Sequence, residues 1–349
     1  MLLARLPSRA ANVATLQTER CSTGPMQLCG NRILSLLICL LIPAACLGQT
    51  REPVETIRVD SDLVDLKVSV VSLNPQNPSP ELQQNDFLVL EDGTPQDISF
   101  FAAADAPFDL VLLLDLSGST RDKLKLIRKS ARRFVDETRP MDRVSVVTFT
   151  DVAQVICPLT HDRRLLKDSI DDVEKPVGGT NFWDSLRYVL AILNASKNTL
   201  RRSAVVVMTD GVDNALPDVL GPGSQTSFED LLRVVRDEET IVFPIYLDTE
   251  KAELRRHSTS RIAYAIARDQ LAQLAEASGS RLYRANELKD LNDVYKQVIG
   301  DLGRIYSIGY RPSNTLRDGK WRSVSIQIQD RRDVMARTKQ GYYSRSLSN

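Results

Sequence analysis

The sequence has few of the residues that most often build catalytic sites and tight transition-metal sites. Among 349 residues there are two histidines and five cysteines. Four of the cysteines precede residue 50, which leaves only Cys157 for the rest of the chain. A disulfide framework and a thiolate metal site are therefore excluded from that part. We expect Cys157 to be a small buried residue on a strand rather than a reactive thiol.

An excess of charge of either sign is also lacking. The 45 basic and 45 acidic side chains give a formal net charge of zero. Such a chain has no overall field that would attract nucleic acid or an anionic membrane surface. The composition is that of a globular protein, and the length allows two domains with a substantial core.

Long apolar runs are limited to one. Residues 33–48, ILSLLICLLIPAACLG, precede a polar stretch. The run is short for a membrane span and typical of the hydrophobic region of a signal peptide, with cleavage after Gly48. We interpret 1–48 as a leader, with Met26 as an alternative start. The mature protein is expected to be exported, periplasmic or secreted, without a membrane span, and Cys46 leaves a lipid anchor open as an alternative.

Residues 106–303 alternate between strand and helix patterns. Phe108 to Leu114 is an apolar run with the length and composition of a strand buried on both faces. Apolar stripes at helical spacing follow, the first at 121–138. The alternation predicts a doubly wound, mostly parallel α/β sheet with helical crossovers. The other runs expected to be strands are 144–149, 153–157, 203–209, 240–247 and 281–283, and 250–261 is expected to be a charged loop.

Strand patterns flank this part on both sides. Before it, 54–105 contains about four expected strands, one of them Thr56–Val59. Four strands are too few to close a buried sandwich by themselves. After it, 304–345 contains further strand patterns separated by turn residues. We therefore predict that 54–105 and 304–345 pack as one β-sandwich-like domain, into which the α/β domain at 106–303 is inserted.

Oxygen-bearing side chains follow the buried strands of the α/β part. Asp115, Ser117 and Ser119 come directly after the first buried run, and their alternate spacing turns the three side chains the same way. Thr180 follows a Gly-Gly pair ahead of an expected helix, and Asp210 follows the run VVVMT. The carboxyl ends of parallel strands lie on one rim of a sheet, where these five groups can meet.

Two carboxylates and three hydroxyls make a hard-oxygen donor set, which suits Mg²⁺ or Mn²⁺ rather than zinc or copper. Asp115 and Thr180 are also good helix N-caps, and this interpretation stays open beside metal binding. Asp184, one turn into the helix after Thr180, is expected to support the loop from behind the site. Asp213 and Asn214 are interpreted as turn formers, with a second oxygen cluster as the alternative.

The motifs DLSGS at 115–119, GGT at 178–180 and TDG at 209–211 resemble the three loops of the metal-ion-dependent adhesion site of von Willebrand factor type A domains. The stretches DFLVLEDGTPQDISFF, YSIGYRP and GYY are similar to those that flank this domain in exported bacterial proteins described as von Willebrand factor A related. The resemblance covers most of 55–345 and implies a type A domain within 106–303.

The resemblance also implies roles for the five residues. Ser117, Ser119 and Thr180 would offer side-chain oxygens to the ion, and Asp115 and Asp210 would hold it directly or through bound water. In the family, a carboxylate of a partner protein often completes the coordination. Mg²⁺ wants six ligands, and neutral hydroxyls leave it ready to accept such an anionic oxygen.

These features favour a non-enzymatic function. The leading hypothesis is an exported module whose Mg²⁺-type ion binds an acidic group of a partner protein. The first alternative is a metal-dependent hydrolase or phosphoryl-transfer enzyme, which needs a base or nucleophile near the ion, yet neither His161 nor His257 lies in a motif loop. The second alternative is a scaffold with a structural ion, in which Trp321 and Tyr342-Tyr343 are exposed anchors.

Overall fold

The structure is a computed structural model, which describes residues 63–72, 81–102, 106–174, 178–196, 201–256, 259–285 and 290–346. The predicted leader 1–48, the expected strand Thr56–Val59 and His257 lie outside these described residues. None of the helices in this part of the chain combines the length and apolar character needed to cross a bilayer.

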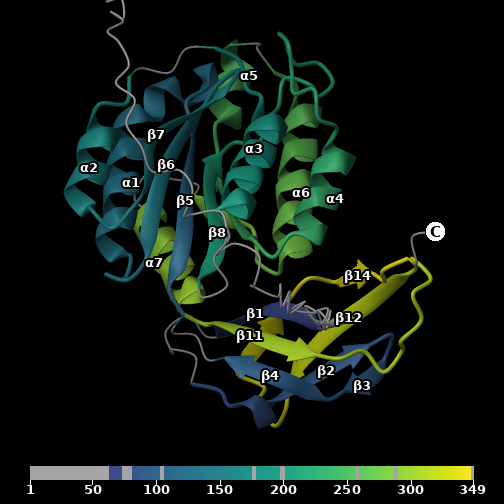
Figure 1. The fold of residues 1–349 in the computed structure, drawn as a ribbon. Helices are drawn as coiled ribbons and strands as arrows, with labels where there is room; N and C mark the ends of the chain where they lie inside the picture. The colour runs from purple at the N-terminus through teal and green to yellow at the C-terminus, as the bar shows by residue number, and fades with distance from the viewer. Residues whose placement is uncertain are drawn as a thin grey trace, which may run out of the picture. The chain divides into compact units, whose positions relative to one another are not determined.

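A six-stranded sheet lies at the centre of the α/β part, in the order β10-β9-β8-β5-β6-β7 (Figure 1). Its strands pair in parallel except for β7, which runs antiparallel to β6 at one edge. The predicted doubly wound, mostly parallel sheet is thus confirmed. The strands are β5 (Phe108–Asp115), β6 (Arg143–Phe149), β7 (Ala153–Thr160), β8 (Arg202–Thr209), β9 (Ile241–Leu247) and β10 (Tyr283–Ala285).

Helices cover both faces of this sheet because its central strand is apolar on both faces. Leu110, Leu112 and Leu114 of β5 pack with α1, α2 and α7, whereas Val111 and Leu113 pack with α3, α4 and α6. Every residue of β5 is buried, and each aliphatic side chain there contributes roughly 1.5–3 kcal/mol of hydrophobic stabilisation. The helices are α1 (Leu124–Glu137), α2 (Arg163–Asp171), α3 (Phe182–Ala195), α4 (Phe228–Asp237), α5 (Glu250–Arg256), α6 (Arg261–Ser278) and α7 (Asp290–Leu302).

The helix α5 corrects one expectation, because its segment was expected to be a charged loop. Glu250 and Glu253 occupy its first turn, where the partial positive charge of a helix N-terminus stabilises carboxylates. Arg268 of α6 pairs with Glu250 at 2.7 Å. A local acidic start and one ion pair with the next helix thus support a helix that the charge pattern alone concealed.

Two antiparallel four-stranded sheets form the β part, in the orders β13-β1-β11-β4 and β14-β12-β2-β3. Each sheet combines strands from before and after the α/β part, since β1 pairs with β11 and β2 pairs with β12. The predicted insertion into a β-sandwich-like fold is therefore confirmed, and apolar side chains of both sheets share one core. The strands are β1 (Val64–Ser72), β2 (Phe87–Glu91), β3 (Thr94–Gln96), β4 (Ile98–Ala102), β11 (Ile305–Tyr310), β12 (Trp321–Ile328), β13 (Val334–Arg337) and β14 (Gly341–Tyr343), with a 3₁₀ turn at Gln84–Asp86.

The aromatic residues considered as exposed anchors are mostly used inside the β part. The Tyr342 hydroxyl donates to Oε2 of Glu91 at 2.8 Å. Trp321 is half-buried and meets Tyr343 edge-on, with ring centroids 5.0 Å apart. Tyr343 is exposed by 55%. Of the three aromatic rings, Tyr343 alone presents most of its surface to solvent.

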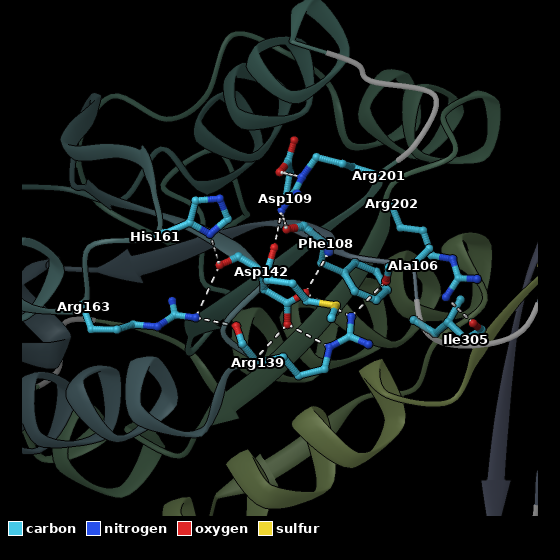
Figure 2. A network of polar contacts seen from close by, with 11 residues as sticks. Ala106, Phe108, Asp109, Arg139, Asp142, His161, Arg163, Arg201, Arg202 and Ile305 are labelled. Atoms are coloured by element: carbon cyan, nitrogen blue, oxygen red, sulfur yellow. Dashed lines mark hydrogen bonds and ion pairs between the residues drawn. The ribbon is translucent and has the colours of Figure 1, made fainter.

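An arginine network lies at the amino ends of the strands, opposite the rim that carries the motif loops (Figure 2). Asp109 accepts hydrogen bonds from Arg143 at 2.8 and 2.6 Å and from Arg201 at 2.6 Å. Asp142 accepts a hydrogen bond from the backbone N–H of Phe108 at 2.8 Å. The network therefore ties the starts of β5, β6 and β8 together.

Candidate metal centre

Asp115, the last residue of β5, is fully buried and held at both carboxylate oxygens. Its Oδ1 accepts the backbone N–H of Ser117 at 2.8 Å. Its Oδ2 accepts the hydroxyl of Thr209, the last residue of the neighbouring strand β8, at 2.5 Å. Parallel pairing of the two strands thus determines the orientation of this carboxylate.

The two serines of the DLSGS loop face the end of β8, the strand next to β5 in the sheet. The Ser117 and Ser119 hydroxyl oxygens lie 3.1 Å apart. Ser119 also donates to Oδ2 of Asp210 at 2.7 Å. The loop is closed by Thr120, whose hydroxyl donates to the carbonyl oxygens of Asp115 at 3.0 Å and Ser117 at 2.9 Å. Four of the five predicted site residues therefore belong to one hydrogen-bonded cluster.

Thr180 lies in a loop that backbone contacts join to the other two. The Gly118 N–H donates to the Gly178 carbonyl at 3.4 Å, and the Asn214 N–H donates to the Thr180 carbonyl at 2.9 Å. The Thr180 N–H in turn donates to the side chain of Asn214 at 3.2 Å. The three motif loops are thus neighbours, while the role of the buried Thr180 hydroxyl as a ligand stays a prediction.

The electrostatics of the cluster favour a cation. Burial, and then the neighbouring Asp210, raise the pKa of Asp115 to about 7. Burial also raises the pKa of Asp210, while the positive charge of Lys123 lowers it. The ammonium group of Lys123 donates a hydrogen bond to the carbonyl oxygen of Asp248. Two buried carboxylates beside one lysine are short of positive charge, and buried charges need a partner.

This donor set fits a small divalent ion with a preference for oxygen. The described residues hold no group of three or more His, Cys, Asp or Glu side chains that would suit a metal. The cluster instead offers two carboxylates together with hydroxyls, which are hard ligands for Mg²⁺ or Mn²⁺. Asp115, Ser117 and Asp210 are buried, whereas Ser119 is half-buried and Gly178 is exposed. A ligand from solvent would therefore approach on the side of Ser119 and Gly178.

The neighbouring acids organise loops. Asp213 is fully buried and accepts the backbone N–H groups of Trp183 at 3.0 Å, Ala215 at 2.8 Å and Ser224 at 3.0 Å. It thus acts as the turn-forming residue that the sequence favoured. Asp184 accepts the N–H groups of the segment 225–226 at 2.8 and 2.9 Å. It supports the loop that follows Asp213 rather than a group of the cluster itself.

Sequence reasoning missed Thr249. Its hydroxyl donates to Oδ2 of Asp210 at 2.6 Å, and the hydroxyl of Tyr264 lies 2.9 Å from it. No motif marks a lone threonine in the segment Asp248-Thr249-Glu250. The available signal was its position just after the buried strand β9, on the same rim as Asp115 and Asp210.

Residues 110–212 match the family model described as "von Willebrand factor type A domain". This segment is a von Willebrand factor type A domain. Type A domains often carry a metal-ion-dependent adhesion site, and they bind proteins. The predicted type A domain is confirmed, whereas the assignment to an exported bacterial subgroup stays a prediction.

Relatives of this type A domain are distant. A "UPF0353 protein" of Mycolicibacterium paratuberculosis is 22% identical over 205 residues, covering 56% of this chain and 61% of the relative. An uncharacterized protein of Borreliella burgdorferi is 26% identical over 114 residues, covering 31% of this chain and 33% of the relative. The chain therefore spans about a third to three fifths of the length of these curated relatives.

The solved structures that match this chain also have low sequence identity to it. BatB of Bacteroides thetaiotaomicron matches with 14% identity and a TM-score of 0.42, over 56% of this chain and 98% of that one. The pilus adhesin SpaC of Lactobacillus rhamnosus GG matches with 10% identity and a TM-score of 0.45, over 81% of this chain and 47% of that one. Proximal thread matrix protein 1 of the mussel byssus, with a zinc-occupied MIDAS motif, matches with 19% identity and a TM-score of 0.44. The match covers 61% of this chain and 49% of that one.

Proposed function

We propose that this protein is an exported protein-binding module that works without enzymatic activity and depends on a metal ion. A Mg²⁺ or Mn²⁺ ion at the rim of the type A domain binds an acidic side chain of a partner protein. The observation that carries the proposal is the convergence of Asp115, Ser117, Ser119 and Asp210 into one hydrogen-bonded cluster with too little positive charge.

The proposed ligand set uses residues from all three motif loops. Ser117, Ser119 and Thr180 supply neutral oxygens, and Asp115 and Asp210 supply negative charge directly or through water. When bound, the ion supplies an electrophilic centre that accepts an anionic oxygen. The half-buried position of Ser119 supports access for a partner's carboxylate from the solvent side.

The position of His161 supports a binding function over hydrolysis. Its Nδ1 lies 3.2 Å from the backbone carbonyl of Asp142, within the network at the amino ends of the strands (Figure 2). The motif loops lie at the opposite ends of those strands. A general base must reach the reacting group within hydrogen-bond distance, so His161 is not the base that a hydrolase would need at the ion.

The test uses Asp115→Ala in the full chain. We expect this variant to lose both Mg²⁺ uptake and capture of the partner from a native envelope extract, while its circular dichroism stays that of the wild type. Chelation of the metal with EDTA should release the partner from the wild-type protein. Asp269→Ala, which removes an exposed carboxylate on α6, is the matched control and should behave like the wild type.

Two outcomes would count against the proposal. Partner capture that continues in EDTA or in Asp115→Ala would favour a scaffold in which the β part makes the contacts. Turnover of phosphate or ester substrates that disappears in Asp115→Ala would favour the enzyme hypothesis.

A further inference from the structure

A chain of hydrogen bonds reaches Asp210 from helix α6, outside the three motif loops. The Thr249 hydroxyl donates to Oδ2 of Asp210 at 2.6 Å. The same hydroxyl lies 2.9 Å from the hydroxyl of Tyr264. All three side chains are buried, with exposed fractions of 0% for Asp210 and 1% for Thr249 and Tyr264. Water therefore does not compete for these contacts.

The direction of the protons along this chain follows from the number of donors. A threonine hydroxyl has one proton, and an ionised carboxylate only accepts. Because the Thr249 hydroxyl donates its only hydrogen to the bond with Asp210, it must be the acceptor in the hydrogen bond with Tyr264. The bonds therefore run from Tyr264 to Thr249 to Asp210, and each hydroxyl has a defined partner.

The segment that carries Thr249 is itself anchored to the first motif loop. Lys123, which ends the 3₁₀ turn Gly118–Lys123, donates to the carbonyl of Asp248. The N–H of Glu250 donates to the Asp248 carboxylate at 3.1 Å. Thr249 thus stands between two residues whose positions are determined by hydrogen bonds.

Helix α6 also contacts the third motif loop through apolar packing. Gly211, directly after Asp210, has a φ of +75°. A Cβ built on it would lie 2.7 Å from Cδ1 of Leu271. The backbone at Gly211 is therefore held against α6 by close packing, and the side chain of Asp210 is held there through Thr249.

We propose that Thr249 and Tyr264 are positioning residues of the metal centre, an inference that rests on the proposed function. They hold the Asp210 carboxylate where its Oδ2 accepts the proton of Ser119. Because the Ser119 hydroxyl donates its hydrogen to Asp210, it can accept only from Ser117 in their 3.1 Å contact, and its second lone pair is left for the ion. Neither residue touches the ion in this account, and both act through Asp210.

The test measures the Mg²⁺ dissociation constant of the full chain by isothermal titration calorimetry. Thr249→Val keeps the shape of the side chain and removes its hydroxyl, and it should weaken Mg²⁺ binding roughly 10- to 100-fold, as loss of groups that orient metal ligands does. Thr249→Ser keeps the hydroxyl and should bind like the wild type. Tyr264→Phe should weaken binding roughly two- to tenfold, and it should add nothing in the Thr249→Val background.

Matched controls remove the same groups elsewhere. Thr138→Val removes a buried hydroxyl at the end of α1, and Tyr295→Phe removes a buried phenol hydroxyl on α7. Both should keep the wild-type Mg²⁺ affinity. The melting temperature of each variant in EDTA reports any purely structural effect, and a structural role would lower it while leaving the Mg²⁺-induced rise unchanged.

The possible results distinguish a failure of the positioning role from a failure of the proposed function. Wild-type Mg²⁺ affinity in Thr249→Val, or equal losses in the controls, would overturn the positioning role and leave the metal centre intact. A wild-type protein that takes up no Mg²⁺ would overturn both. Should Thr249→Val fail to fold, unchanged Mg²⁺ affinity in Tyr264→Phe would overturn the positioning role by itself.

Discussion

At the scale of single residues, the second motif loop depends on positions that only glycine can occupy. Gly178 has a φ of +120°, and a Cβ on it would lie 2.6 Å from Oδ2 of Asp151. The other oxygen of Asp151 accepts the N–H of Gly179 at 3.0 Å. Asp151, which follows β6, therefore holds the loop that carries Thr180, and a side chain at Gly178 would displace it.

Gly178→Ala should destabilise the fold by about 1–3 kcal/mol, the usual cost of a backbone conformation that L-residues avoid. It should also weaken Mg²⁺ binding, because Asp151 would no longer fix the Thr180 loop. Denaturant unfolding and calorimetry measure the two effects. Gly300→Ala on α7, where a Cβ meets nothing within 4 Å, should instead stabilise the protein by roughly 0.5–1 kcal/mol. Equal stability in both variants would contradict this account of the loop.

Asp115, Ser117, Ser119 and Asp210 could be predicted as a cluster because each lies at or just after the end of a buried strand with a clear apolar signal. The same strand-end rule applies to Thr249, but a single threonine without a motif gave no reason to select it. Its contact with Asp210 depends on the position of α6 and on Tyr264, which no local pattern specifies. Residue type and strand order were readable, and the side-chain partner from a distant helix was not.

At the scale of helices and strands, the amino ends of β5, β6 and β8 are joined by the Asp109 carboxylate. Burial raises the pKa of Asp109, but hydrogen bonds from Arg143 and Arg201 outweigh burial and hold the pKa below its usual value. A carboxylate with a lowered folded pKa stabilises the protein above the unfolded pKa of about 4. That stability is lost as the pH falls through the folded pKa.

Asp109→Asn should therefore lower the free energy of unfolding at neutral pH by roughly 2 kcal/mol. The difference from the wild type should shrink as the pH falls below about 4, because the Asp109 carboxyl of the unfolded wild-type chain takes up a proton there, before that of the folded protein does. Urea unfolding at neutral and acidic pH provides the measurement. Asp168→Asn removes one member of a largely exposed ion pair and should have little effect at either pH. A difference for Asp109→Asn that stays constant down to the lowest pH would refute the ion-pair account.

The types of element could be predicted with more success than their boundaries. β5 was readable because an uninterrupted apolar run ends in polar residues. The first helix was expected from residue 121, but α1 begins at Leu124 after the 3₁₀ turn Gly118–Lys123. Thr120 causes this turn by bonding back to the carbonyls of the loop, and such a tertiary contact has no signature in helix periodicity. The same limit concealed α5, whose first turn is held by Arg268.

At the scale of the whole molecule, Arg202 joins the inserted type A domain to the β part. Arg202 opens β8 and is 4% exposed. Its guanidinium donates to the carbonyl of Ile305 (Figure 2). It also donates, at 3.3 Å, to the hydroxyl of Ser307, and both partners lie on β11. These contacts link the central sheet of one part to a central strand of the other.

Arg202→Met should reduce the cooperativity between the two parts. The chain has two tryptophans, Trp183 on α3 and Trp321 on β12, so Trp321→Phe and Trp183→Phe backgrounds report on each part separately. We expect both fluorescence transitions to coincide during urea unfolding with Arg202 present and to separate in Arg202→Met. Arg233→Met, on the exposed side of α4, is the control and should keep the transitions together. Coincident transitions with unchanged midpoints in Arg202→Met would contradict the link.

The insertion itself was predictable from an imbalance of strands, because 54–105 has too few strands to bury a core without 304–345. The pairing of β1 with β11 and of β2 with β12 agrees with that reasoning. The register of these pairs was not predictable, since it depends on contacts between segments that the whole α/β part separates. Arginines such as Arg202 were likewise unremarkable in the sequence until the fold placed them between the two parts.

The most direct test of the central claim is a titration of the full chain with Mn²⁺, followed by electron paramagnetic resonance of the free ion. We predict that the wild-type protein binds about one ion per chain and that Asp115→Ala leaves the added Mn²⁺ free while retaining its fold. Equal uptake by both proteins, or none by the wild type, would contradict a metal centre at Asp115, Ser117, Ser119, Thr180 and Asp210.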